Sequence, residues 1–252
     1  MLYISLIVLY YNSKGNLIST RGRSGEVMNK EWSELNKTMQ SQLKRKDTYK
    51  EGFETLFDLR DSLMDTINSF KKELSIDDFS AMPFINADGY HSKTIAYSLW
   101  HIFRIEDIVA HTLIKGDEQI FFKDGYVKRI NSPIITTGNE LVKHEIADFS
   151  KQLNLEELYS YISDVKTSSE IILQGLSFDD LKRHVTDDAK ENLKSLHVVS
   201  EDENAIWLID FWCKKNIKEL IQMPFSRHWI MHVEASLRIK SSKNKMSPNK
   251  QH

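Results

Sequence analysis

Apolar residues recur at steps of three and four along most of this chain, and that spacing constrains its fold more than any other feature. In residues 49–74 they form one helical face, made of Phe53, Leu56, Phe57, Leu63, Met64, Ile67 and Phe70. Residues that break helices are scarce, because only nine glycines and four prolines occur among 252 residues. Sandwiches and barrels of many short strands need more turns than this. The pattern therefore predicts an all-α protein.

The expected architecture is an up-and-down four-helix bundle with additional short helices. The same periodicity places its long helices at residues 49–74, 90–115, 154–176 and 226–240. Residues 117–139 are the least helical part: Asp124-Gly125 has the composition of a hairpin turn, and a proline at position 133 favours extended backbone. We expect a loop or small hairpin there, covering one end of the bundle.

Both ends of the chain differ in composition from its middle. The apolar run at residues 1–11 is too short to span a bilayer as a helix, and a polar segment rich in glycine and serine follows it. We therefore expect residues 1–27 to be a poorly structured N-terminal extension and residues 28–240 to form the bundle. The polar residues 241–252 are expected to be a disordered tail.

Charge and cysteine content narrow the possible partners. Thirty-four basic residues nearly cancel 36 acidic ones, for a formal charge of −2. Proteins that bind nucleic acid normally carry a net basic surface, because neutralising phosphates drives their affinity. The single cysteine, Cys213, excludes an internal disulfide and fits a reducing cytosol. We expect a cytoplasmic protein that binds neither nucleic acid nor membrane.

Two of the nine histidines, His228 and His232, stand four residues apart in a predicted helix. That spacing stacks both imidazoles on one helical face, where they can chelate one metal ion. The same face continues through Ala235 and Ile239, so we expect the pair to point into the bundle. Such a pair also occurs by chance in helices without any metal, and a third ligand from another helix would strengthen the case.

His101 is the best-placed third ligand, because it shares an apolar helical face with Ile105 and Ile108. Three histidines around one ion leave coordination positions open, as in catalytic metal sites. His91 is interpreted as a helix cap or a solvent-exposed side chain. The remaining candidates stand among charged residues and are interpreted as surface positions: His111, His144, His184 and His197.

Two segments resemble motifs of a known family. The stretch WHIFRIEDIVAHTLI, residues 100–114, resembles the second-helix motif of the DinB family, and MPFSRHWIMHVEASLRIK, residues 223–240, resembles its last-helix motif. (This is the damage-inducible, YfiT-like helical family, not the DNA polymerase of the same name.) The resemblance covers roughly residues 28–240. The N-terminal extension and the long segment 117–139 depart from the family pattern.

The resemblance implies a four-helix bundle with a histidine triad that binds nickel or zinc. The family's ligand positions fall on His101, His228 and His232. Members often form homodimers, and some are transferases or isomerases that use a low-molecular-weight thiol such as bacillithiol or mycothiol. Arg104, Asp107 and Glu234 are expected to have structural roles, since isolated charged pairs usually do.

Three interpretations of the histidines stay open on the sequence. The first is a metal-dependent enzyme, a thiol S-transferase or a hydrolase, acting on a small molecule with a metal-activated thiol or water. Its pocket walls are expected from residues 84–90 and from the loop after Gly116, and no general base is assigned. The second is a non-catalytic, stress-related metal-binding or interaction bundle, recognisable by a fourth protein ligand or by a site without a cavity. The third is a bundle whose core histidines hold no metal and need hydrogen-bond partners instead.

Overall fold

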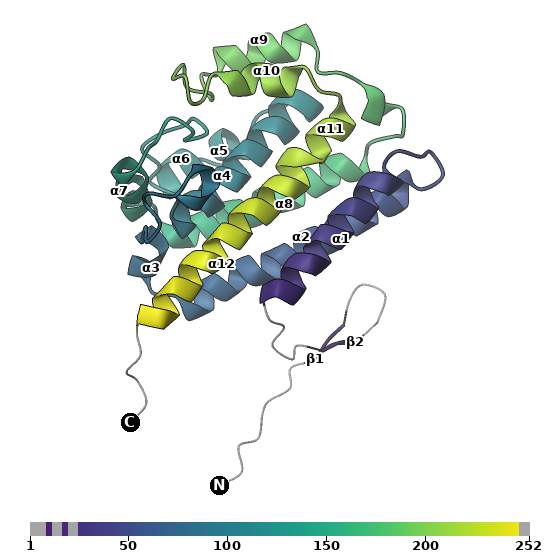
Figure 1. The fold of residues 1–252 in the computed structure, drawn as a ribbon. Helices are drawn as coiled ribbons and strands as arrows, with labels where there is room; N and C mark the ends of the chain where they lie inside the picture. Colours follow the sequence, from purple (N-terminus) through teal and green to yellow (C-terminus); the bar gives the residue numbers. More distant parts are fainter. Residues whose placement is uncertain (1–8, 12–16, 20–24, 247–252) are drawn as a thin grey trace.

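The computed structural model describes residues 9–11, 17–19 and 25–246, and it confirms the all-α prediction. Its helices are α1 (Gly25–Gln42), α2 (Tyr49–Glu73), α3 (Ile76–Ser80), η1 (Gly89–His91), α4 (Ile95–Asp107), η2 (Ile108–Lys115), α5 (Ile120–Lys123), α6 (Tyr126–Arg129), α7 (His144–Gln152), α8 (Leu155–Gln174), η3 (Asp180–Lys182), α9 (Asp187–Ser195), α10 (Trp207–Cys213), α11 (Ile217–Ile221), η4 (Met223–Arg227) and α12 (His228–Met246). The η elements are short 3₁₀ or π-helical segments. Figure 1 shows their arrangement.

Helix α4 is the centre of the molecule, because every one of its residues is buried. It begins at Thr94, whose side chain accepts a hydrogen bond from the backbone N–H of Tyr97 and so caps the helix. It packs against α8 and α12, and α12 in turn contacts α1 and α2 (Figure 1). The π-helical η2 continues α4 and ends at Gly116 in the left-handed conformation, where the sequence predicts a helix stop.

One buried arginine forms hydrogen bonds with residues of several helices. All five N–H groups of Arg60, on α2, are hydrogen-bonded. Two of these bonds form a bidentate ion pair with Glu106 on α4, at 2.9 and 2.7 Å. The others reach Glu170 and Ser169 on α8 and the carbonyl oxygen of Phe225. Because Arg60 and Glu106 are fully buried, this pair links α2, α4 and α8 inside the core.

The segment after Gly116 is a loop with two one-turn helices, α5 and α6, and not a hairpin. Asp124 and Gly125 lie between these helices. The physical reason is a tertiary cap: the carboxylate of Asp107 accepts the backbone N–H groups of Ile120 and Phe121, both at 2.9 Å, and so starts α5. Asp107 therefore has a structural role, as expected.

Arg104 also has the structural role expected of it. Its guanidinium donates to the carbonyl oxygen of Ile135 and to the side chain of Gln119, and it lies 4.4 Å from the ring centroid of Phe121. These contacts hold the loop after Gly116 against α4. That loop passes beside His101, so its placement matters for the candidate site.

The chain ends differ in part from the expectations. In the predicted extension, Leu9–Tyr11 (β1) and Leu17–Ser19 (β2) pair as antiparallel strands, and the rest of residues 1–24 lies outside the described residues. Helix α12 continues to Met246, so the predicted tail begins as helix, and residues 247–252 lie outside the described part. Within the described residues, no helix is both long and apolar enough to cross a membrane.

Candidate metal centre

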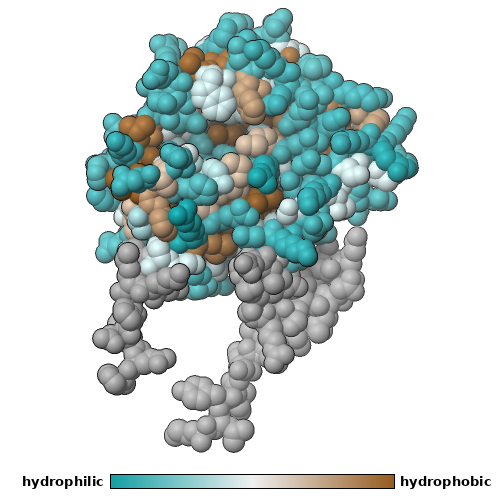
Figure 2. Space-filling view, viewed as in Figure 1, coloured by the Kyte–Doolittle hydropathy of each residue, from teal (hydrophilic) through white to brown (hydrophobic). Residues whose placement is uncertain are grey.

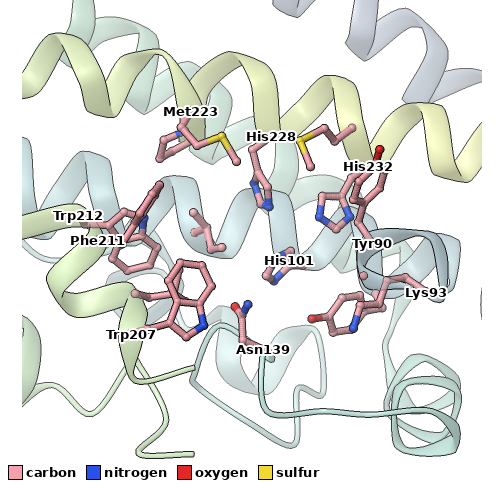
Figure 3. A pocket seen from close by; sticks show the side chains of 16 residues that line it. Tyr90, Lys93, His101, Asn139, Trp207, Phe211, Trp212, Met223, His228 and His232 are labelled. Carbon is pink, nitrogen blue, oxygen red and sulfur yellow. The ribbon is translucent and has the colours of Figure 1, made fainter. Parts of the chain in front are cut away.

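The structure brings His101, His228 and His232 together. Their ring centroids are 4.9 Å (His101 to His228), 5.0 Å (His101 to His232) and 4.6 Å (His228 to His232) apart. One ring nitrogen from each lies within 4.8 Å of the other two, and all three side chains are buried. Figure 3 shows His228 and His232 on α12 facing His101 on α4. The predicted clustering of these three residues is confirmed.

The spacing of the two motifs explains how this cluster forms. His228 and His232 stand one helical turn apart at the start of α12, so their rings share the face that packs on α4. His101 lies in the middle of α4, opposite that face. The neighbouring Val233 and Ile239 of α12 are buried in the same core, which keeps the helix in this orientation.

The hydrogen bond of His101 sets its tautomer. Its Nδ1 lies 2.6 Å from the backbone carbonyl oxygen of Thr137, which can only accept, so Nδ1 carries the hydrogen. The lone pair is then on Nε2. Metal-binding histidines usually donate their other ring N–H to such an oxygen, which orients the ring and raises its basicity. His101 thus has the arrangement expected of a metal ligand.

His228 and His232 each have a buried Nδ1 without a hydrogen-bond partner in the described part of the chain. Burial lowers the pKa of His101 to about 4, and burial with mutual repulsion lowers the pKa of His228 and His232 well below the usual value. All three imidazoles are therefore neutral at pH 7, the form that binds metal ions. Unpaired buried nitrogens on neutral rings fit a shared divalent cation, because a cation would satisfy the lone pairs that the protein leaves without donors.

A cavity of about 330 Å³ opens onto this cluster. Among its lining residues are all three histidines, with Tyr90 and Lys93 on the side away from α10 and Asn139 between the two sides (Figure 3). Figure 2 shows apolar side chains gathered between α10 and α12 on an otherwise largely hydrophilic face. The cavity gives a water molecule or a small ligand room beside the histidines.

Sequence reasoning located only part of this wall. Tyr90 belongs to residues 84–90 and Asn139 ends the loop after Gly116, the two segments expected to form pocket walls. The α10 residues Trp207, Leu208, Phe211 and Trp212 were not assigned to the cavity, because an apolar helical stretch is typical of core. In the structure Trp207 is 49% exposed, and no pattern in the sequence marks that exposure.

Among the other described histidines, His91 lies near the cluster: its ring centroid is 4.0 Å from that of Tyr90, which is 6.0 Å from that of His232. His91 is partly buried, so the solvent-exposed interpretation holds only in part.

His144, His184 and His197 are exposed, as predicted. The surface interpretation of His111 is wrong: this side chain is buried, and its nitrogens lie 2.6 Å from a carboxylate oxygen of Asp117 and 3.1 Å from the hydroxyl of Ser168. Charged neighbours in sequence misled the prediction, because η2 packs against α8 and buries this side chain.

The backbone next to Thr137 gives a test of how the loop supports His101. Gly138 has φ +75°, and an added Cβ would lie 2.8 Å from the ring of Trp100. We expect Gly138→Ala to lower the free energy of unfolding by roughly 2–4 kcal/mol, from left-handed strain plus overpacking. Chemical denaturation measures this loss. The carbonyl of Thr137 moves with the loop, so weaker metal binding should accompany it.

Gly116→Ala is the matched control for this substitution. Gly116 has φ +77°, but an added Cβ would meet nothing within 4 Å, so only the backbone strain of about 1 kcal/mol applies. The difference between the two variants isolates the contact with Trp100. Equal losses of unfolding free energy in both variants would show that the loop shifts to accommodate the added methyl group. The loop would then not hold Thr137 against His101.

No known family model matches the chain, and no curated protein sequence matches it.

Proposed function

We propose that this protein is a DinB-like metal-binding protein that uses a nickel or zinc ion, held by His101, His228 and His232, in a reaction on a small molecule. One observation supports this most directly: three buried, neutral imidazoles from two helices converge at the end of a cavity. The two motifs that resemble the DinB family contain these same three residues. Irving–Williams preferences allow several divalent ions at such a site, so cellular supply would decide which one is bound.

The reaction we propose is thiol S-transfer or hydrolysis. A divalent cation supplies Lewis acidity, which lowers the pKa of a thiol or water at neutral pH. His101, His228 and His232 would hold the ion, and Thr137 would keep His101 oriented through its carbonyl oxygen. The aromatic wall of the cavity would exclude bulk water from the reacting groups, which strengthens electrostatic interactions there.

Metal content tests the binding half of this proposal. Protein purified without a histidine tag should contain about one equivalent of nickel or zinc by elemental analysis, and His228→Gln should contain almost none. His144→Gln is the control, because His144 is exposed and away from the cluster. Circular dichroism checks that each variant is folded. A wild-type protein that stays metal-free after incubation with both ions would refute the proposal.

Turnover tests the catalytic half. The metal-loaded protein is assayed with thiol and electrophile pairs and with a panel of esters and amides. Product that forms with the wild type and not with His228→Gln would support an enzyme. Full metal occupancy without turnover on any member of the panel would favour the non-catalytic, metal-binding alternative.

A further inference from the structure

The cavity beside the three histidines is chemically asymmetric. One wall is aromatic, formed by Trp207, Phe211 and Trp212 of α10. The ring centroids of Trp207 and Phe211 are 5.6 Å apart, and Trp207 remains half exposed at the rim of the cavity. Flat, rigid rings of this kind bury the faces of planar apolar ligands at a small entropic cost. This wall therefore favours a ligand with an aromatic body.

The opposite side of the cavity carries a cation without an acidic partner. Lys93 lines the cavity, is partly buried, and forms no ion pair with a carboxylate of the described residues. Its Nζ lies 5.0 Å from the ring centroid of Tyr97, and Tyr97 stacks on His101 at 5.2 Å. Burial lowers the pKa of Lys93. A partly desolvated ammonium beside a binding cavity has most to gain from an anionic ligand.

Lys93 and the three histidines line the same cavity. The ammonium and the candidate metal position therefore both attract negative charge into the same end of the cavity. A single ammonium, without arginines beside it, suits a carboxylate better than a phosphate, which usually gathers several donors.

A third polar group places a separate requirement on the ligand. The side-chain oxygen of Asn139 is buried and has no hydrogen-bond partner among the described residues. Figure 3 shows Asn139 in the cavity between the aromatic wall and the side that carries Lys93. Buried polar atoms are normally paired, so a ligand with a donor group would complete this one.

We propose that the cavity binds a small aromatic carboxylate, with its ring against the α10 wall and its carboxylate toward Lys93 and the histidine cluster. The volume of about 330 Å³ suits a ligand of one or two rings. An aromatic carboxylate would be the substrate class of the proposed function. The inference rests on that function only for the role of the metal. A ring hydroxyl or amino group would donate to Asn139.

Calorimetric titration with 2-naphthoate tests this proposal on the metal-loaded full chain. 2-Acetylnaphthalene, uncharged, without a hydrogen-bond donor and of nearly the same shape, is the ligand control and should bind much more weakly. Lys93→Met should weaken 2-naphthoate binding about tenfold to hundredfold, since it removes a charged partner. Trp207→Ala should weaken both ligands about tenfold, because the aromatic wall contacts their rings.

Lys71→Met is the matched protein control. The Nζ of Lys71 lies 5.4 Å from the ring centroid of Tyr159, so it also sits over a tyrosine, but it does not line the cavity. This variant should bind 2-naphthoate like the wild type. Equal binding of 2-naphthoate and 2-acetylnaphthalene, or unchanged 2-naphthoate binding by Lys93→Met, would overturn the proposal.

Metal analysis of the titrated samples separates the two proposals. Protein that holds metal but fails to bind 2-naphthoate refutes the ligand class and leaves the metal site intact. Protein that takes up no metal refutes the proposed function. If such protein binds 2-naphthoate and Lys93→Met weakens that binding about tenfold or more, the ligand class stands on its own.

Discussion

Replacing Arg60 by methionine is expected to lower the free energy of unfolding by about 3–5 kcal/mol. The substitution keeps most of the side-chain volume but removes the cation that pairs with Glu106, a carboxylate with no exposed surface. Glu106 would keep its hydrogen bonds from Trp229 Nε1, at 2.7 Å, and from the hydroxyl of Ser169. Two neutral donors do not offset a buried charge. Urea denaturation monitored by circular dichroism measures the loss.

The double variant Arg60→Met/Glu106→Gln separates charge from packing. The amide removes the stranded negative charge and can still accept from Trp229, so it should recover much of the stability. Arg129→Met is the control for an exposed pair: Arg129 and Glu157 form a comparable ion pair at 2.7 Å but are both partly exposed. The free energy of unfolding of Arg129→Met should fall by no more than about 1 kcal/mol. A double variant less stable than Arg60→Met would show that the ion pair is not the main stabilising contact there.

The second large effect expected is stabilisation by metal. Metal-free protein should gain about 4 kcal/mol in free energy of unfolding when free zinc or nickel is 1,000 times its dissociation constant. The gain follows because the folded chain preassembles three buried imidazoles, whereas the unfolded chain scatters them. Thermal and urea unfolding in EDTA and in metal measure the difference.

His232→Gln should abolish this metal-dependent gain. Glutamine retains much of the volume of histidine but is a poor ligand for these metals. His184→Gln is the control, because His184 is exposed, and it should keep the full gain. An equal gain in His232→Gln would mean that the ions stabilise the protein elsewhere, and the three-histidine centre would have to be abandoned.

The match between sequence and structure depends on how local each feature is. The pairing of His228 with His232 follows from the pitch of one helix, so four-residue spacing alone predicts it. The orientation of His101 toward the core follows from the apolar face of α4 in the same way. The all-α class and the helix stop at Gly116 are equally local.

Contacts between segments that are distant in the sequence were not predicted. The pairing of Arg60 with Glu106 spans 46 residues, and no local pattern marks either as buried. His111 has charged neighbours in sequence, yet the packing of η2 on α8 buries it. The composition around Asp124 is typical of a hairpin. The segment forms the short helix α5 instead, because the carboxylate of Asp107 caps its first turn.

The sequence by itself determined the helical class and the residues of the candidate metal centre, because apolar periodicity and four-residue spacing act within single helices. Only the tertiary structure decided what surrounds that centre. The carbonyl of Thr137 behind His101, the aromatic wall from α10 and the position of Lys93 beside the cavity all depend on segments that meet through packing. Periodicity specifies which face of a helix is buried, but not which partner covers it, since many apolar faces can pack against one another at similar free energy.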